Sequence, residues 1–133
     1  MSANFAYGEV RPVTDYFNVV LVHNRGAAFS FLSDAGGWQR YLFAAIGLIA
    51  AVGLPILIYR ARGQSLLALS WCLILGGALG NLWDRVVLGY VVDFLDFHWA
   101  ARHWPAFNVA DIAISCGAAV LIADSFRTKA QEK

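Results

Sequence analysis

Three long apolar stretches, more than any other feature, constrain how this 133-residue chain can fold. Residues 41–59 and 64–83 contain no charged side chain, and residues 105–123 contain one, Asp111. A helix of about 20 residues, rising about 1.5 Å per residue, is long enough to cross the hydrocarbon layer of a bilayer. We therefore predict an all-α membrane protein with three transmembrane helices. They are expected at about residues 38–59, 64–87 and 105–125.

The composition favours one membrane-embedded domain over residues 1–133. Hydrophobic residues make up 59% of the chain and charged residues 14%, whereas about 25% of residues are charged in an ordinary soluble domain. The net charge of +1 argues against nucleic acid as a partner, because such partners usually require a strongly basic face. Cys72 and Cys116 lie in apolar segments, where we expect free thiols rather than a disulfide or a metal site.

The basic residues predict how the chain is oriented in the membrane. They gather in the turn after the first span and in the tail after the third: Arg60, Arg62, Arg127, Lys129 and Lys133. Short loops rich in Lys and Arg stay in the cytoplasm. Residues 1–37 and residues 86–107 are therefore expected outside the cytoplasm.

The outer N-terminal region is expected to contain a short strand. Residues 17–23 are rich in apolar and β-branched side chains, and they end at the turn-forming sequence Asn24-Arg25-Gly26. This pattern predicts a small extracytoplasmic sheet resting on the membrane surface. A plain edge hairpin that only covers helix ends is an equally open reading.

A polar stripe runs along the end of the second span. Gly77, Asn81 and Arg85 follow one another at intervals of four residues, which places them on one helix face. Small residues let a second helix approach, and lipid cannot satisfy polar groups, so Asn81, Asp84 and Arg85 are expected to face protein. The alternative is a structural charge cluster near a helix end.

Two further acids flank the outer ends of the second and third spans. Asp93 follows the second span, and Asp111 is expected in the first turn of the third helix, which Asn108 could cap. Two carboxylates 4 Å apart repel by about 4 kcal/mol at an effective dielectric near 20, so one of them keeps its proton. On chemistry alone, acid–base catalysis, a proton relay and a cation site all remain open.

Four ordered motifs resemble those of bacterial lipoprotein signal peptidase, also called signal peptidase II. They are residues 24–30 (NRGAAFS), 80–85 (GNLWDR), 91–94 (VVDF) and 107–111 (FNVAD). One such motif is weak evidence, but four in order on the predicted topology are highly specific. The resemblance extends from about Phe5 to Ser125. The family has four spans, and this chain is expected to lack the first of them.

The resemblance implies an intramembrane aspartyl endopeptidase. Such an enzyme removes the signal peptide from diacylglyceryl-modified prolipoproteins and cuts just before the lipidated cysteine. It implies a multi-pass protein of the bacterial inner membrane, with a β-cradle and an active site near the extracytoplasmic face. The implied partners are a lipid-modified prolipoprotein and membrane lipid, and we expect a monomer without metal or organic cofactor.

The resemblance also implies roles for individual residues. Asp93 and Asp111 match the catalytic pair, and the residues expected to hold substrate backbone and orient the acids are Asn24, Asn81, Arg85 and Asn108. Gly26 is expected to serve turn geometry. From its position three residues after Asp93, Asp96 is expected to be a solvated or hydrogen-bonded loop acid, and a supporting role beside Asp93 is the alternative. The rival reading is a nonenzymatic membrane subunit or small ion-coupled transporter that uses the same buried acids.

Overall fold

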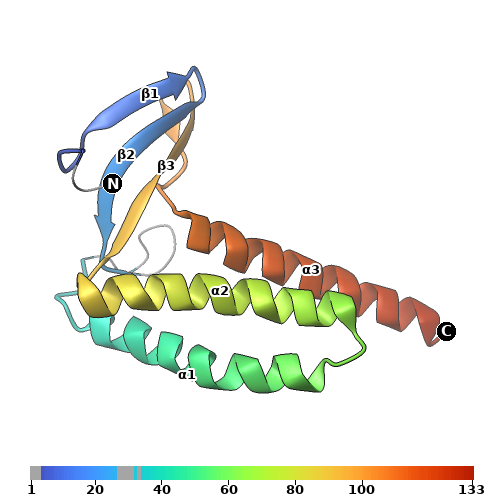
Figure 1. The fold of residues 1–133 in the computed structure, drawn as a ribbon. Coiled ribbons are helices and arrows are strands. Elements are labelled where there is room, and N and C mark those ends of the chain that lie inside the picture. The colour runs from blue at the N-terminus through green and yellow to red at the C-terminus, as the bar shows by residue number, and fades with distance from the viewer. Residues whose placement is uncertain (1–3, 27–31, 33) are drawn as a thin grey trace. The chain divides into compact units, whose positions relative to one another are not determined.

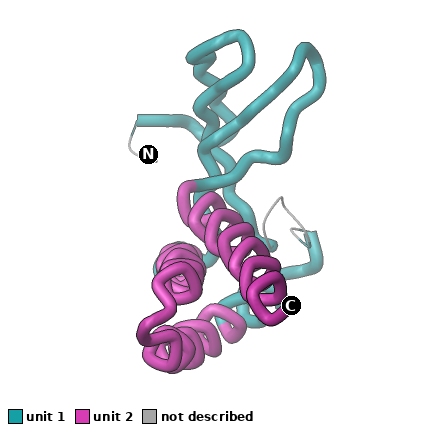
Figure 2. Tube along the Cα trace, turned by 90° about the vertical axis from the view of Figure 1, so that its right-hand side faces the viewer, with its two compact units in different colours: residues 1–44, 83–108 teal, residues 45–82, 109–133 magenta. Residues whose placement is uncertain are grey.

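The computed structural model describes residues 4–26, 32 and 34–133. Along the chain, the elements are β1 (Val10–Thr14), β2 (Phe17–Asn24), α1 (Gln39–Arg60), α2 (Ser65–Val87), β3 (Val91–Trp99), β4 (Arg102–His103) and α3 (Val109–Gln131), as Figure 1 shows. The chain forms two compact units, residues 1–44 with 83–108 and residues 45–82 with 109–133 (Figure 2). We call these the sheet unit and the helix unit.

Three helices, α1, α2 and α3, are long and apolar enough to cross a membrane, as predicted. The bounds of the first two match the prediction to within one residue. Helix α3 begins four residues later than predicted, because Phe107 still exchanges backbone hydrogen bonds with Leu95 of β3. It also continues to Gln131, since no glycine or proline follows Ser125 to stop it.

The sheet unit contains a four-stranded antiparallel sheet in the order β1-β2-β3-β4. The strand predicted over residues 17–23 is confirmed as β2, whereas β1, β3 and β4 were not predicted. Strand β2 is central, with β1 on one side and β3 on the other. The register between β2 and β3 shifts between Val19 and Val22, which marks a bulge or irregularity.

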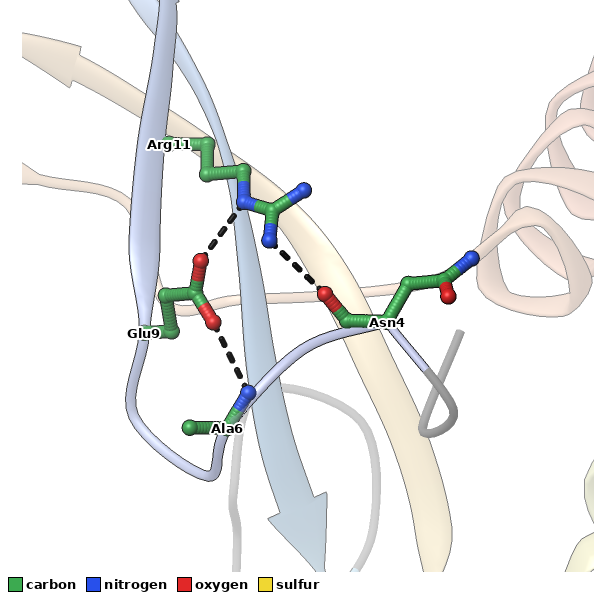
Figure 3. Close-up of polar contacts among 4 residues, drawn as sticks. All are labelled: Asn4, Ala6, Glu9 and Arg11. Atoms are coloured by element: carbon green, nitrogen blue, oxygen red, sulfur yellow. Dashed lines mark hydrogen bonds and ion pairs between the residues drawn. The ribbon is translucent and has the colours of Figure 1, made fainter.

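The entry to the edge strand β1 is fastened by a small polar network (Figure 3). The Nε of Arg11 donates to Oε1 of Glu9 at 2.6 Å, and the backbone N–H of Ala6 donates to Oε2 at 2.8 Å. The Nη2 of Arg11 donates to the carbonyl oxygen of Asn4 at 2.7 Å. The Ala6 N–H and then the guanidinium hold the pKa of Glu9 below its ordinary value. Charged side chains of this kind discourage edge-to-edge pairing.

Two glycines bring α2 and α3 together in the helix unit. A methyl group on Gly77 would collide with the carbonyl oxygen of Ala110 and lie 2.6 Å from Cγ1 of Ile114. A methyl group on Gly117 would lie 2.7 Å from Cγ1 of Ile74. Small residues are therefore required at these two crossings, as membrane helices generally use them.

Candidate active site

Asp93 is the buried centre of a hydrogen-bonded group in the sheet unit. Its carboxyl group lies on β3 and the residue is 0% exposed. The amide nitrogen of Asn24 donates to Oδ2 at 3.0 Å, and that of Asn108 donates to Oδ1 at 2.8 Å. Both carboxyl oxygens therefore accept a hydrogen bond from an asparagine, which is how a buried acid keeps a fixed orientation.

The strand register explains why Asn24 meets Asp93. Asn24 lies directly opposite Val91 in the antiparallel pair, so the two share one face of the sheet. Side chains two residues apart on a strand also share a face, which puts Asp93 diagonally across from Asn24. An amide and a carboxyl group are long enough to bridge that diagonal.

Arg85 holds the turn that follows β2. The N–H of Gly26 donates to Oδ1 of Asn24 at 2.8 Å, and Nη2 of Arg85 donates to the carbonyl oxygen of Gly26. Arg85 is 7% exposed. A chain of contacts thus runs from the end of α2 through the turn to Asn24 and Asp93. The remaining residues of that motif, 27–30, lie outside the described residues.

The neighbouring Asp84 makes a structural contact. Its Oδ2 accepts a hydrogen bond from the N–H of Val92 at 3.1 Å, which ties the end of α2 to the start of β3. The helix ends at Val87, and Gly89, two residues later, has a φ of 87° that suits a glycine just past a helix end. This contact favours the interpretation of Asp84 as a structural group near a helix end.

Asp111 is the buried acid of the helix unit. It lies in the first turn of α3, as predicted, and is 7% exposed. The amide nitrogen of Asn81, on α2, donates to its Oδ1 at 3.1 Å. Asn81 is one helical turn from Gly77, so the close approach of α3 at that glycine brings the amide within reach. The N-terminus of a helix also favours a negative group by about 0.3–1 kcal/mol.

The two acids are linked along the chain by a short connection. Asn108, which donates to Asp93, immediately precedes the first residue of α3, and Asp111 follows it by three residues. The structure therefore gives each acid a buried place with asparagine donors in its own unit. The pairing of Asp93 with Asp111 stays a prediction from the sequence.

Asp96 occupies a third buried acidic position. It is hydrogen-bonded, as predicted, but it lies within β3 and not in a loop. The amide of Asn18 donates to its Oδ2 at 2.8 Å, and Nδ1 of His103 lies 3.0 Å from both carboxyl oxygens. Neither the Asn18 contact nor the His103 contact of Asp96 was predicted from the sequence. A lone asparagine in an apolar strand was the available signal, because a buried amide requires a partner.

Comparison with known proteins gives one consistent family. A family model described as signal peptidase (SPase) II matches residues 1–127. A lipoprotein signal peptidase of Cupriavidus pinatubonensis is 59% identical over 123 residues, which cover 92% of this chain and 70% of that protein. One of Ralstonia nicotianae is also 59% identical over 123 residues, with 92% of this chain and 71% of that protein covered.

Solved structures agree with the sequence comparison. A bacterial membrane enzyme solved by the in meso method at 2.3 Å resolution superposes with a TM-score of 0.85 and 28% identity. The match covers 99% of this chain and 79% of that one. A second such structure, at 1.9 Å resolution, gives a TM-score of 0.78 and 29% identity over 93% of this chain and 79% of that one. The motifs, the fold and both comparisons agree, and the chain belongs to the signal peptidase II family.

Proposed function

We propose that this chain removes signal peptides from diacylglyceryl-modified prolipoproteins as an intramembrane aspartyl endopeptidase that cuts just before the lipidated cysteine. Membership of the signal peptidase II family and three apolar helices make the chain a multi-pass bacterial membrane protein. The relatives named above are lipoprotein signal peptidases, which supports a prolipoprotein as the substrate. The inner membrane is the proposed location, and the chain is proposed to act as a monomer within one domain.

One observation carries the catalytic assignment. Asp93 is fully buried, yet each of its carboxyl oxygens accepts a hydrogen bond from an asparagine amide. A buried acid is costly unless it is held in this way, and such acids are concentrated at functional sites. Asp111 has the same kind of donor, Asn81, and lies three residues from Asn108. We therefore propose Asp93 and Asp111 as the catalytic pair.

The proposed mechanism divides the work between the two carboxyl groups. One is ionised and the other protonated, because two neighbouring negative charges would repel by about 4 kcal/mol. The ionised carboxylate takes a proton from a water molecule, whose oxygen attacks the scissile carbonyl carbon. The protonated carboxyl group donates to the developing oxyanion and then supplies the proton with which the amine leaves. The shared proton belongs to the pair, since coupled acids titrate as one unit.

The surrounding polar residues are proposed to position the acids and the substrate backbone. Asn24 and Asn108 fix the two oxygens of Asp93, and Asn81 fixes one oxygen of Asp111. Arg85 acts through the carbonyl group of Gly26. All these groups belong to segments that leave or enter spans at the end opposite the basic turn, which supports an active site near the extracytoplasmic face.

The rival reading is a nonenzymatic subunit or an ion-coupled transporter that uses the same acids. Both readings require buried carboxyl groups in a membrane protein. Family membership favours the peptidase, because the family model covers residues 1–127 and includes all four motifs.

The decisive experiment removes one acid at a time. The variants Asp93→Asn and Asp111→Asn keep side-chain size and are expected to lower cleavage of a lipid-modified prolipoprotein by at least about 10³-fold, the scale of acid–base catalysis. Asp124→Asn, on the same helix as Asp111 but close to its far end, serves as the control and is expected to retain full activity. Membrane insertion is measured for all three variants.

Two outcomes would contradict the proposal. Full processing by either acid variant would exclude an aspartyl pair. Acid-dependent ion flux in liposomes without peptide cleavage would instead support the transporter.

A further inference from the structure

The sheet unit contains a pocket, lined by two arginines, that the proposed peptide cleavage does not use. It has a volume of about 340 Å³ and lies where α1 begins and α2 ends. Its lining includes Arg25, Arg40, Tyr41, Gly89 and Tyr90. Asp93, its donors Asn24 and Asn108, and Asp111 are not among its lining residues.

The pocket is positively charged. Two of its lining residues are arginines and none is acidic. Among the described residues, no ion pair involves Arg25 or Arg40. A cavity of about 630 Å³ shares Arg25, Gly37 and Gln39 with this pocket and also includes Asp34, but Asp34 does not line the arginine pocket. The arginine charges are therefore not neutralised within the pocket.

The guanidinium group of Arg40 has more N–H donors than its hydrogen bonds to the described residues use. Its Nε donates to the carbonyl oxygen of Arg85 at 3.2 Å, and Nη2 donates to that of Val86 at 3.4 Å. These two contacts hold the last turn of α2. A guanidinium has five N–H groups, so three of them have no acceptor within the described part of the chain. Arg25, which is exposed, has no hydrogen bond there at all.

The position of the pocket matches the headgroup layer of the membrane. Arg40 and Tyr41 belong to the first turn of α1, and Gly89 and Tyr90 lie two and three residues after the end of α2. Both helices are long enough to span the bilayer, so these residues lie where the hydrocarbon gives way to headgroups. Tyr and Arg are the residues that typically anchor a span at this depth.

We propose that Arg25 and Arg40 bind the phosphate of an anionic phospholipid headgroup in this pocket. Guanidinium groups match phosphate oxygens with paired N–H donors, which favours arginine at phosphate sites. Arg25 stands between Asn24 and Gly26, in the turn that follows β2. Asn24 in this turn donates a hydrogen bond to Asp93. A bound headgroup would therefore fasten this turn to the membrane surface. The lipid in this site is distinct from the peptidase substrate.

The test measures binding of phosphatidylglycerol to the full chain in detergent by native mass spectrometry. Arg25→Gln is expected to weaken binding about fivefold, which corresponds to the roughly 1 kcal/mol that one basic residue contributes near an anionic lipid. Arg102→Gln is the matched control, because it removes an equal charge from an exposed residue of the same unit that lines a different cavity. This control is expected to bind as the wild type does.

Arg40→Gln is expected to weaken binding as well, but Arg40 also holds the end of α2. Arg25→Gln is therefore the decisive variant, and thermal unfolding of both variants is recorded. Wild-type binding by Arg25→Gln would overturn the proposal. Displacement of the lipid by millimolar inorganic phosphate would also overturn it, because the pocket would then be a site for free phosphate. Phosphatidylcholine is expected to bind more weakly than phosphatidylglycerol, and equal binding would contradict a role for negative charge.

Discussion

Strands β2 and β3 carry two asparagine–aspartate pairs at opposite ends of their contact. At one end, the amide of Asn24 donates to Asp93, and at the other the amide of Asn18 donates to Asp96. The two hydrogen bonds measure 3.0 and 2.8 Å. All four side chains belong to buried residues. Burial and hydrogen bonding alone therefore do not distinguish a catalytic acid from a structural one.

The two pairs differ in their third member. Asp93 is also bound by Asn108, the residue that precedes α3 and stands three residues before Asp111. Asp96 is instead contacted by His103, whose side chain is about half exposed. Only the Asp93 pair is thus tied to a segment that carries a second buried acid. The proposed catalytic aspartate is therefore distinguished by its connection, through Asn108, to a segment with a second buried acid. The asparagine–aspartate hydrogen bond alone does not distinguish it.

The largest expected effect comes from breaking the pair at the Asp93 end. Asn24→Ala removes the donor to Asp93 and the acceptor for Gly26, so the carboxyl group loses its fixed position. Misplacing a catalytic group by about 1 Å can cost about 10²-fold, and we expect kcat/KM for prolipoprotein cleavage to fall by that amount. Asn18→Ala, on the same strand, is the matched control and should change kcat/KM less than threefold. Equal losses in both variants would remove the distinction between the two ends.

A smaller effect is expected from Arg85→Gln. Arg85 donates to the carbonyl oxygen of Gly26, whose N–H donates to Asn24, so its loss loosens the turn that positions the Asn24 donor of Asp93. We expect kcat to fall about tenfold, less than for Asn24→Ala because the effect is indirect. Steady-state kinetics and the unfolding temperature are measured together. A loss of activity larger than that of Asn24→Ala would instead indicate direct contact between Arg85 and the substrate.

At the other end of the strands, Asp96→Asn should affect stability more than cleavage. In this variant an NH₂ group replaces one carboxyl oxygen, and this new donor would face the N–H donors of Asn18 and His103. A buried donor left without an acceptor costs about 1–3 kcal/mol. Thermal unfolding should therefore occur at a lower temperature, while the folded fraction cleaves at a rate within threefold of the wild type. Loss of cleavage at full stability would show that Asp96 takes part in the reaction.

The sequence predicted the helices better than the sheet. Uncharged runs of about 20 residues have few alternatives to a membrane span, so the bounds of α1 and α2 follow directly from composition. Strand β3 was not predicted because Asp93 and Asp96 interrupt its apolar pattern, and aspartate is rare in strands. Its buried positions include both acids, which reverses the usual rule that the polar residues of a strand face water.

The candidate site was predicted as a set of residues but not as a geometry. Motif resemblance selected Asn24, Asp93 and Asn108, which the structure joins by hydrogen bonds. The contact between Asn24 and Asp93 depends on a strand register that shifts between Val19 and Val22. A shift of one residue turns every following side chain to the other face. Local sequence patterns do not reveal such a shift, so the geometry required the structure.

The smallest expected effect concerns His23, which precedes Asn24 on β2 and stacks on Tyr90 with ring centroids 3.9 Å apart. Burial, and then the charge of Arg25, lower the pKa of His23 below its ordinary value. The unfolded chain therefore binds a proton more readily, so stability is complete above about pH 6.5 and is lost as the pH falls below that value. Acidification should thus weaken the Asn24 end of the strands selectively.

His23→Phe keeps a stacking ring but cannot take up a proton. Between pH 7.5 and pH 5.5, we expect the unfolding temperature of this variant to fall by about 2 °C less than that of the wild type, a shift that corresponds to less than 1 kcal/mol. Hydrogen exchange should place the difference at residues near Asn24 and not near Asn18, because only the former adjoin His23. An equal loss of protection at both ends would mean that the two asparagine–aspartate pairs open as one cooperative unit, in which case their different roles arise from chemistry and not from local stability.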